Sequence, residues 1–450
     1  MMAGTEMSTI GHFEVQETLY SQGFYRVKRA RNTLTGQPCA LKLLKKSHKL
    51  SDGLLRSLSP LLEKEYEVRH SLHHPNILPA HSLDLNATYS KRQATQVPVM
   101  YMETDLCPYT DFFALQAAAG GPFSEQLARR FFQQLIDAVS YCHKQKVIHW
   151  NLRPESLALD SNFDLKVTDF GTEPRTNDAS SPPEVLAGEM RSGQAVDVFC
   201  CGFVLFFWSY FEPPFQRADM SNSFFRQLAN GAEKFWVRAK RTSPISADLK
   251  SLLAGMMAVD PTQRLSLSEV KAHPWYTSPA LGRESAQQQL SEMIERCSAA
   301  KSRLCGRPKP MAVHNESSLY RGGADSTSLS DFTASFSSTQ SLTGPIALYC
   351  SGAWKYSELF LNLPPETALS YVETALSQQY AEVEERAKPF KLRAKLVTDT
   401  GNIKFSVQAL DCSDGKLCLD FQQQSGSEFE FYQLFTEVTR YLETRVELAD

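Results

Sequence analysis

Residues 149–156 read His-Trp-Asn-Leu-Arg-Pro-Glu-Ser, and the tripeptide Asp169-Phe170-Gly171 follows them. A tripeptide of this kind occurs by chance in many proteins, so neither stretch decides the fold by itself. Further signals accompany them in a fixed order along the chain: Ala40-Leu41-Lys42, Glu65, Pro182-Pro183-Glu184, Asp197 and Arg264. An ordered set that spans half of the chain is not expected by chance, and it indicates one particular fold.

The segments around these signals predict strands first and helices afterwards. Apolar and polar residues alternate in three short segments, and apolar residues recur every four positions from Phe123 to Val139. The predicted strands are residues 15–19, 25–30 and 38–44, and the predicted helices are residues 124–144, 185–212 and 247–257. Strands followed by helices favour an α+β arrangement, with a small sheet lobe and a larger helical lobe.

At these spacings, residues 12–276 resemble a eukaryotic protein kinase domain of the calcium/calmodulin- and AMP-activated type. The resemblance implies a bilobal α+β fold that binds ATP and Mg²⁺ between its lobes. It also implies that Lys42 holds the nucleotide phosphates, that Glu65 anchors this lysine, and that Asp169 is the main magnesium ligand.

Other matches fall at positions that the family uses for structure, and two more, Met102 and Glu103, fall at the gatekeeper and hinge positions that contact the nucleotide in the family. Asp197 braces the catalytic loop, and Glu184 forms a buried ion pair with Arg264 in the family pattern. The positions in this class are His149, Asp197, Glu184, Arg264, Met102 as the gatekeeper, and Glu103 as the first hinge residue. Their presence predicts that the fold is kept.

The hairpin that binds phosphates in the family departs from the pattern. Glycines there let backbone N–H groups approach phosphate without a Cβ in the way. Their positions hold Tyr20, Gln22 and Tyr25 in this chain. Val27 keeps its register and Gly23 is present out of register, so both stay candidate nucleotide contacts. We expect the binding of ATP and Mg²⁺ to be weak or absent, and we expect any nucleotide binding to depend on the metal.

The catalytic loop departs further. Asn151 stands where the family has the aspartate base, and an amide cannot take the substrate's proton, a loss of about 10²- to 10⁴-fold. Ser156 replaces the asparagine ligand of a second magnesium and is expected to be a weak ligand. Arg153 keeps a positive charge near the γ-phosphate position. Trp150 replaces an arginine that reads a phosphorylated loop, so switching by loop phosphorylation is not expected.

The composition changes after the kinase-like region. Residues 1–11 are predicted to be a tail, and residues 277–344 a linker with one short helix. Between residues 316 and 343, 13 of 28 residues are Ser or Thr, which is typical of mostly disordered segments. Residues 345–450 resemble the small α+β kinase-associated domain that closes AMP-activated and microtubule-affinity-regulating kinases.

One predicted strand of this last region carries a basic face. Lys391, Arg393 and Lys395 alternate with apolar residues, so they lie on the same side of a strand. The face is either a solvated surface or a patch for a protein partner or anionic lipid, where each basic residue adds about 1 kcal/mol.

The overall composition excludes several classes. The chain has 450 residues and a net charge of −3, from 47 basic and 50 acidic residues, so nucleic acid is not an expected partner. Its N-terminus lacks the features of a secretory signal, and its ten cysteines show no CxxC spacing. We expect a cytoplasmic protein with protein partners, among them kinase subunits or substrates.

Three hypotheses for function follow from the sequence. The first is a pseudokinase that acts as a scaffold or allosteric regulator in phosphorylation signalling. The second is a slow but genuine ATP-dependent Ser/Thr kinase, because Lys42, Glu65 and Asp169 are present. The third is a peripheral membrane adaptor that works through the C-terminal domain.

Overall fold

The computed structural model divides into two compact units, residues 1–299 with 351–356, and residues 300–350 with 357–450. Each unit is described by itself. The structure describes residues 8–22, 25–45, 52–90, 96–109, 111–119, 121–173, 179–190, 192–231, 233–237, 244–303, 347–348, 358–387, 390–398, 401–411, 417–443 and 445. Most of the predicted linker therefore lies outside the described residues.

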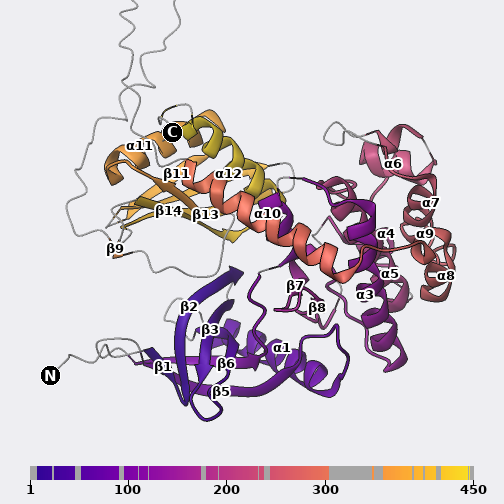
Figure 1. The fold of residues 1–450 in the computed structure, drawn as a ribbon, viewed down its shortest axis with the longest axis horizontal. Helices are drawn as coiled ribbons and strands as arrows, with labels where there is room; N and C mark the ends of the chain where they lie inside the picture. Colours follow the sequence, from indigo (N-terminus) through magenta and orange to yellow (C-terminus); the bar gives the residue numbers. More distant parts are fainter. Residues whose placement is uncertain are drawn as a thin grey trace, which may run out of the picture. The chain divides into compact units, whose positions relative to one another are not determined.

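The small lobe is a closed six-stranded barrel in the order β1-β2-β3-β4-β6-β5, with one helix, α1 (Figure 1). Its elements are β1 Ser8–Ile10, β2 Phe13–Gln22, β3 Tyr25–Asn32, β4 Pro38–Lys45, α1 Asp52–Ser71, β5 Ala80–Ser90 and β6 Gln96–Thr104. The three predicted strands are confirmed. The predicted tail is wrong in part, because β1 pairs with both β2 and β5 and buries Ile10 in the barrel core.

The large lobe is helical around the short hairpin β7–β8. Its elements are α2 Phe112–Ala119, α3 Glu125–Lys144, β7 Leu157–Leu159, β8 Leu165–Val167, α4 Pro183–Leu186, α5 Gly193–Tyr210, α6 Ser223–Ala229, α7 Ala247–Met256, α8 Leu267–Ala272, α9 Pro274–Thr277 and α10 Arg283–Arg303. Helix α3 begins where Ser124 accepts a hydrogen bond from the Leu127 N–H. The helix predicted over 185–212 is two helices, since Gly188 takes a positive φ and Ser192 caps a new start.

Helix α5 is long and apolar enough, by length and composition alone, to cross a membrane. All of its residues from 196 to 210 are buried inside the lobe. The core helix of a globular lobe has this composition, so the apolar run is explained by packing.

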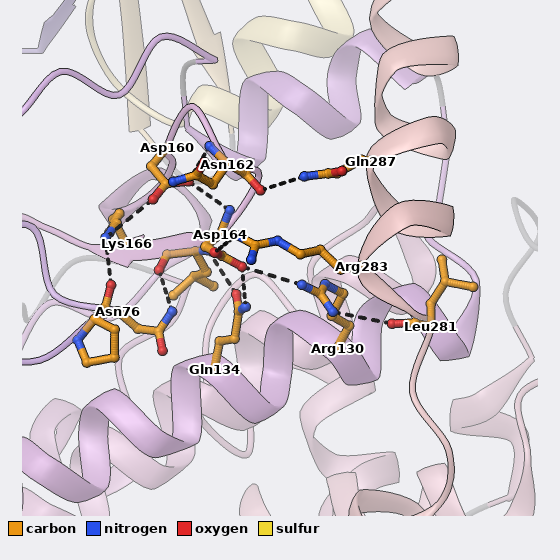
Figure 2. A network of polar contacts seen from close by, with 12 residues as sticks. Asn76, Arg130, Gln134, Asp160, Asn162, Asp164, Lys166, Leu281, Arg283 and Gln287 are labelled. Carbon is orange, nitrogen blue, oxygen red and sulfur yellow. Dashed lines mark hydrogen bonds and ion pairs between the residues drawn. The ribbon is translucent and has the colours of Figure 1, made fainter.

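Helix α10 is anchored to the large lobe by a polar network around Asp164 (Figure 2). Asp164 accepts hydrogen bonds from Gln134 of α3 (2.8 Å) and from Arg283 of α10 (2.6 Å). One turn along α10, Gln287 donates to the carbonyl of Asn162 (3.1 Å). The sequence predicted one short helix here. The structure has a helix of 21 residues that begins on these contacts.

The second unit is one sheet with two helices. The strand order is β10-β14-β13-β12-β11, and β9 pairs with β13 in parallel. The elements are β9 Ala347–Leu348, β10 Glu358–Leu361, α11 Pro365–Gln378, β11 Glu382–Ala387, β12 Lys391–Thr398, β13 Gly401–Asp411, β14 Leu417–Ser425 and α12 Glu428–Glu443. Phe405 of β13 packs on Phe431 of α12, and Phe421 of β14 packs on Phe435, which joins sheet and helix.

Candidate nucleotide site and catalytic loop

A cleft between the two lobes brings together many of the residues singled out in the sequence. Together with the open solvent at its mouth, the cleft holds about 640 Å³ of space. One end is apolar and the other is charged. The lining residues are Leu19, Val27, Ala40, Lys42, Arg69, Leu78, Thr104, Asp105, Cys107, Asp111, Glu155, Ala158, Thr168 and Asp169.

Lys42 on β4 is held between two carboxylates at the charged end. Its Nζ lies 2.7 Å from Oε2 of Glu65 on α1 and 2.6 Å from Oδ1 of Asp169. Burial disfavours its charged form, but the two carboxylates outweigh burial and raise the pKa of Lys42. Burial also disfavours the charged form of Asp169 and would raise its pKa, but the nearby Lys42 holds this pKa below its usual value. Both groups are therefore charged at neutral pH.

Arg69 is a lining residue that sequence reasoning missed. It lies one helical turn after Glu65 on α1 and its side chain is 2% exposed. Its NH1 bonds Oε1 of Glu65 at 3.0 Å, and its Nε donates to the Leu78 carbonyl at 2.9 Å. The spacing of four residues put Arg69 on the same helix face as Glu65, which was the available signal.

The hairpin above the cleft is paired to its tip. Tyr20 stands opposite Val27 and Gln22 opposite Tyr25 in the register of β2 and β3. The Tyr25 ring centroid lies 5.0 Å from Nζ of Lys42, so the aromatic side chain takes space that a glycine leaves open. Val27, a predicted nucleotide contact, lines the cleft, whereas Gly23 lies outside the described residues.

The gatekeeper and hinge positions are occupied by buried side chains of β6. Met102 is fully buried and pairs with Lys42 across the sheet. The Glu103 carboxylate accepts hydrogen bonds from Asn32 (3.2 Å) and Ser82 (2.7 Å), so it holds strands together. The nucleotide contact expected at this position stays a prediction.

Asn151 is fixed by its own amide. Its Nδ2 donates to the Asp169 carbonyl at 2.8 Å, and its backbone N–H donates to Nδ1 of His149 at 3.2 Å. Its Oδ1 is buried and has no hydrogen-bond partner among the described residues. An aspartate in this rotamer would place a carboxylate oxygen against a carbonyl oxygen. The loop is therefore built for an amide here.

The Ser156 hydroxyl is hydrogen-bonded within its own loop. Its hydroxyl donates to the Arg153 carbonyl (2.9 Å) and accepts from the Arg153 N–H (3.0 Å), and the residue is 1% exposed. This reciprocal cap occupies the hydroxyl that the sequence offered as a weak metal ligand. The Arg153 guanidinium lies 3.8 Å from Glu155, so its charge is shared with that carboxylate.

Trp150 fills the space that faces the start of α5. It has a positive φ of 65°, and a Cβ added at Gly193 would lie only 2.5 Å from its ring. A glycine is therefore needed where the indole lies against the helix. Trp150 packs where an arginine would read a phosphate, as expected from its side chain.

The loop backbone rests on a buried carboxylate. Asp197 of α5 is fully buried and accepts from the backbone N–H groups of His149 (2.9 Å) and Trp150 (3.0 Å). Glu184 and Arg264 form a bidentate pair at 2.8 and 3.0 Å, almost entirely buried. These contacts form where the sequence predicted them.

Asp111, also missed from the sequence, lines the cleft at the start of α2. Its Oδ1 accepts from the Ala114 N–H at 2.8 Å. Burial, with a contribution from the Glu155 charge, raises the pKa of Asp111 to about 7. The cleft thus has a carboxyl group that titrates near neutral pH.

The donor set fits a nucleotide better than it fits a metal. An apolar slot beside Lys42 suits a base and phosphates. Mg²⁺ prefers several oxygen ligands in octahedral geometry. Among the residues that the structure describes, no group of three His, Cys, Asp or Glu side chains could hold a metal ion. Asp169, the carboxylate that the resemblance implies as the main magnesium ligand, has one oxygen bonded to Lys42.

The basic face of the second unit carries both signs of charge. In the register of β11 and β12, Glu382 stands opposite Lys395 and Glu385 opposite Arg393. Lys391, which is also on β12, stands opposite Ala387 of β11. The alternation is as predicted, because Leu392 and Ala394 are buried. The glutamates lower the net charge that an anionic surface would meet.

Comparisons with known proteins agree with the cleft geometry. Residues 13–276 match the protein kinase domain. CBL-interacting serine/threonine-protein kinase 14 of Arabidopsis thaliana is 31% identical over 280 residues, 59% of this chain and 58% of the relative. The carbon catabolite-derepressing protein kinase of Saccharomyces cerevisiae is 32% identical over 279 residues, 59% of this chain and 40% of the relative.

A third relative is the sucrose non-fermenting protein kinase 1 of Fusarium virguliforme, 31% identical over 282 residues. The match spans 60% of this chain and 37% of that protein, so this chain covers only part of the length of such relatives. Protein kinase domains bind ATP and Mg²⁺ in general. The fold, the ion pairs of the cleft and the extent of the match together place this chain in the protein kinase family.

Proposed function

We propose that this chain holds a nucleotide in its cleft and acts as a scaffold or allosteric regulator in protein phosphorylation signalling, without efficient phosphoryl transfer. The observation that carries the proposal is the hydrogen bond from Asn151 Nδ2 to the Asp169 carbonyl, 2.8 Å long. It gives the amide a structural role at the position where a base is needed.

The chemistry follows from that contact. Because the nitrogen of the amide is turned to the carbonyl, Oδ1 of Asn151 is the only atom of the side chain left to meet a substrate hydroxyl. It can accept a hydrogen bond but cannot take the proton at neutral pH, so the step loses general-base help of about 10²- to 10⁴-fold. Ser156 adds to this defect, since its hydroxyl caps Arg153.

Nucleotide binding is supported by the other end of the cleft. Lys42 is charged, buried and oriented by Glu65 and Asp169, which is the arrangement that meets phosphate oxygens. The Tyr25 ring above it narrows the approach. We therefore propose binding that is weaker than in an active kinase.

The proposed partners are proteins. The names of several relatives describe them as CBL-interacting, which supports a partner-regulated role for this chain. The second unit, a separate sheet with two helices, is the element that we propose for contact with a partner. A kinase-associated identity for this unit and a cytoplasmic location are parts of the same proposal.

Radiolabel transfer from ATP to a generic basic protein tests the proposal, with Lys42→Met as the background. We expect the full chain and Lys42→Met to incorporate the same label, while a thermal-shift titration detects ATP bound to the full chain only. Label incorporation that Lys42→Met abolishes would contradict the proposal.

A slow but genuine Ser/Thr kinase is the second candidate. It is favoured by the formed Lys42–Glu65 pair at 2.7 Å and by Phe170, which packs 4.3 Å from the His149 ring. The comparison of the full chain with Lys42→Met separates the two functions, because only an active kinase would lose phosphoryl transfer when Lys42 is replaced.

A further inference from the structure

The guanidinium of Arg69 is a second buried cation in the cleft, beside Lys42. Arg69 is 2% exposed and is one of the residues that line the cleft. Two of its nitrogens are bonded, NH1 to Glu65 and Nε to the Leu78 carbonyl. Its NH2 is buried and has no hydrogen-bond partner among the described residues. A buried, unpaired N–H donor with a positive charge is costly unless an acceptor reaches it.

Arg69 changes the charge of the phosphate end. Two cations, Lys42 and Arg69, are linked to two carboxylates, Glu65 and Asp169, so the four groups sum to zero. Without Arg69 the same groups would sum to −1. A net negative cluster attracts a divalent cation and repels phosphate, and a neutral cluster does neither. The arginine thus supplies part of the charge that a metal ion would bring.

The other oxygen atoms near Lys42 also disfavour a magnesium ion. Oδ1 of Asp169 is bonded to Lys42 at 2.6 Å, and its Oδ2 lies 3.2 Å from the Thr168 hydroxyl. Ser156 is capped and 1% exposed. A magnesium ion at Oδ2 of Asp169 would compete with the Thr168 hydroxyl and would meet the positive charges of Lys42 and Arg69. A phosphate group meets both charges favourably.

We propose that Arg69 is a second phosphate-binding cation, and that the cleft binds nucleoside di- and triphosphates without a divalent metal. The inference rests on the proposed nucleotide binding and specifies its chemistry. It differs from the sequence-based expectation of metal-dependent binding, because the sequence did not place Arg69 in the cleft. The base would lie in the apolar slot of Leu19, Val27 and Ala40, with the phosphates toward Lys42.

A purely structural role for Arg69 makes a different prediction. Its bonds to Glu65 and Leu78 hold α1 in place, and their loss would weaken nucleotide binding equally with and without metal. The dependence on metal, rather than the affinity itself, therefore separates the two roles.

The experiment is calorimetric titration of the full chain with ATP, in EDTA and in excess Mg²⁺. Arg69→Gln removes the charge and keeps an N–H donor for Leu78 or Glu65. Arg69→Lys keeps the charge. Lys64→Leu is the matched control, since it removes an exposed charge from the same helix, where Lys64 lies 3.8 Å from Glu67. The unfolding transition of each apo variant is recorded, and Arg69→Leu serves as a second neutral variant.

We expect the wild-type and Lys64→Leu affinities to differ by less than about threefold between the two buffers. We expect Arg69→Gln to lose about tenfold or more in EDTA, the loss of one charged contact, and to recover most of it in Mg²⁺. Arg69→Lys should follow the wild type. Wild-type binding that requires Mg²⁺, or an equal loss for Arg69→Gln in both buffers, would overturn the inference and leave nucleotide binding intact. No binding in either buffer would overturn the proposed function as well.

Discussion

Two parts of the large lobe differ in the role of their polar side chains. One is the brace, formed by the buried residues Asp197, Glu184 and Arg264, and the other is the catalytic loop. The brace has its full set of contacts. Asp197 accepts from two backbone N–H groups, and Arg264 grips Glu184 with two nitrogens. In the loop, the Asn151 amide nitrogen and the Ser156 hydroxyl donate to backbone carbonyls, while Oδ1 of Asn151 has no partner among the described residues.

The difference shows which part of the molecule is built for folding and which for chemistry. A loop whose side-chain donors are bonded to backbone carbonyls has few groups left with which to bind a metal or move a proton. The backbone can therefore keep its conformation while the reaction is lost. Variants that weaken the brace should change stability, and variants in the loop should change stability less and activity hardly at all.

The largest effect is expected for Arg264→Leu. The substitution leaves the Glu184 carboxylate without its bidentate partner. Both side chains are nearly inaccessible to solvent, so water cannot replace the lost contacts. Breaking a buried pair on one side costs about 3–5 kcal/mol. Urea unfolding of the full chain, followed by the fluorescence of the buried Trp208 and Trp275, measures the loss.

Arg217→Leu is the matched control for this variant. Arg217 pairs with Asp219 at 2.6 Å on the surface, where its side chain is 52% exposed. Exposed pairs contribute about 0–1 kcal/mol. Equal losses for the two arginines would show that the buried brace has no special weight.

Asp111→Asn should stabilise the protein at neutral pH and above. Burial raises the pKa of Asp111 to about 7, so the protonated form is stabilised in the folded state. This stability is present at low pH and is lost as pH rises through about 7. The asparagine still accepts the Ala114 N–H. We expect a gain on the order of 2 kcal/mol at pH 8, discounted for the shared effect of Glu155.

The measurement is the denaturant midpoint of both proteins from pH 5 to pH 8. The gain of Asp111→Asn should shrink as the pH falls, because the wild-type carboxyl becomes protonated. A gain for Asp111→Asn that is independent of pH would contradict the assignment.

A smaller effect is expected for Ser156→Ala in the loop. It removes the reciprocal cap between Ser156 and Arg153, which is worth about 1 kcal/mol. Thermal unfolding should detect a shift of a few degrees, about 2–4 °C. A loss as large as that of Arg264→Leu would show that the loop carries as much stability as its brace.

The sequence predicted the fold and the linear motifs because their residues act at fixed spacings. Lys42, Glu65 and Asp169 come together as the ordered motifs implied. Arg69 was not predicted, because a charged residue on a helix is ordinarily solvated, and its burial depends on contacts with Leu78 and Glu65.

The same reason explains the other differences. The strand β1 has only three residues, and its pairing with β5, far along the chain, is not visible in the sequence. The hydroxyl of Ser156 was offered to a metal because its local cap with Arg153 depends on backbone geometry. Asp111 took its high pKa from burial beside Glu155, which spacing does not reveal.

Single-turnover phosphoryl transfer tests the central claim most directly. The wild type and Asn151→Asp are mixed with radiolabelled ATP and Mg²⁺ at occupancies fixed by titration, and label transfer to a basic protein is followed by rapid quench. In Asn151→Asp the rotamer of Asn151 would set a carboxylate oxygen against the Asp169 carbonyl, and the cap of Ser156 on Arg153 is not altered. We predict rates below about 0.01 s⁻¹ for both proteins, at least 100-fold under the low end for kinases. Transfer at about 1 s⁻¹ by either protein would contradict the account.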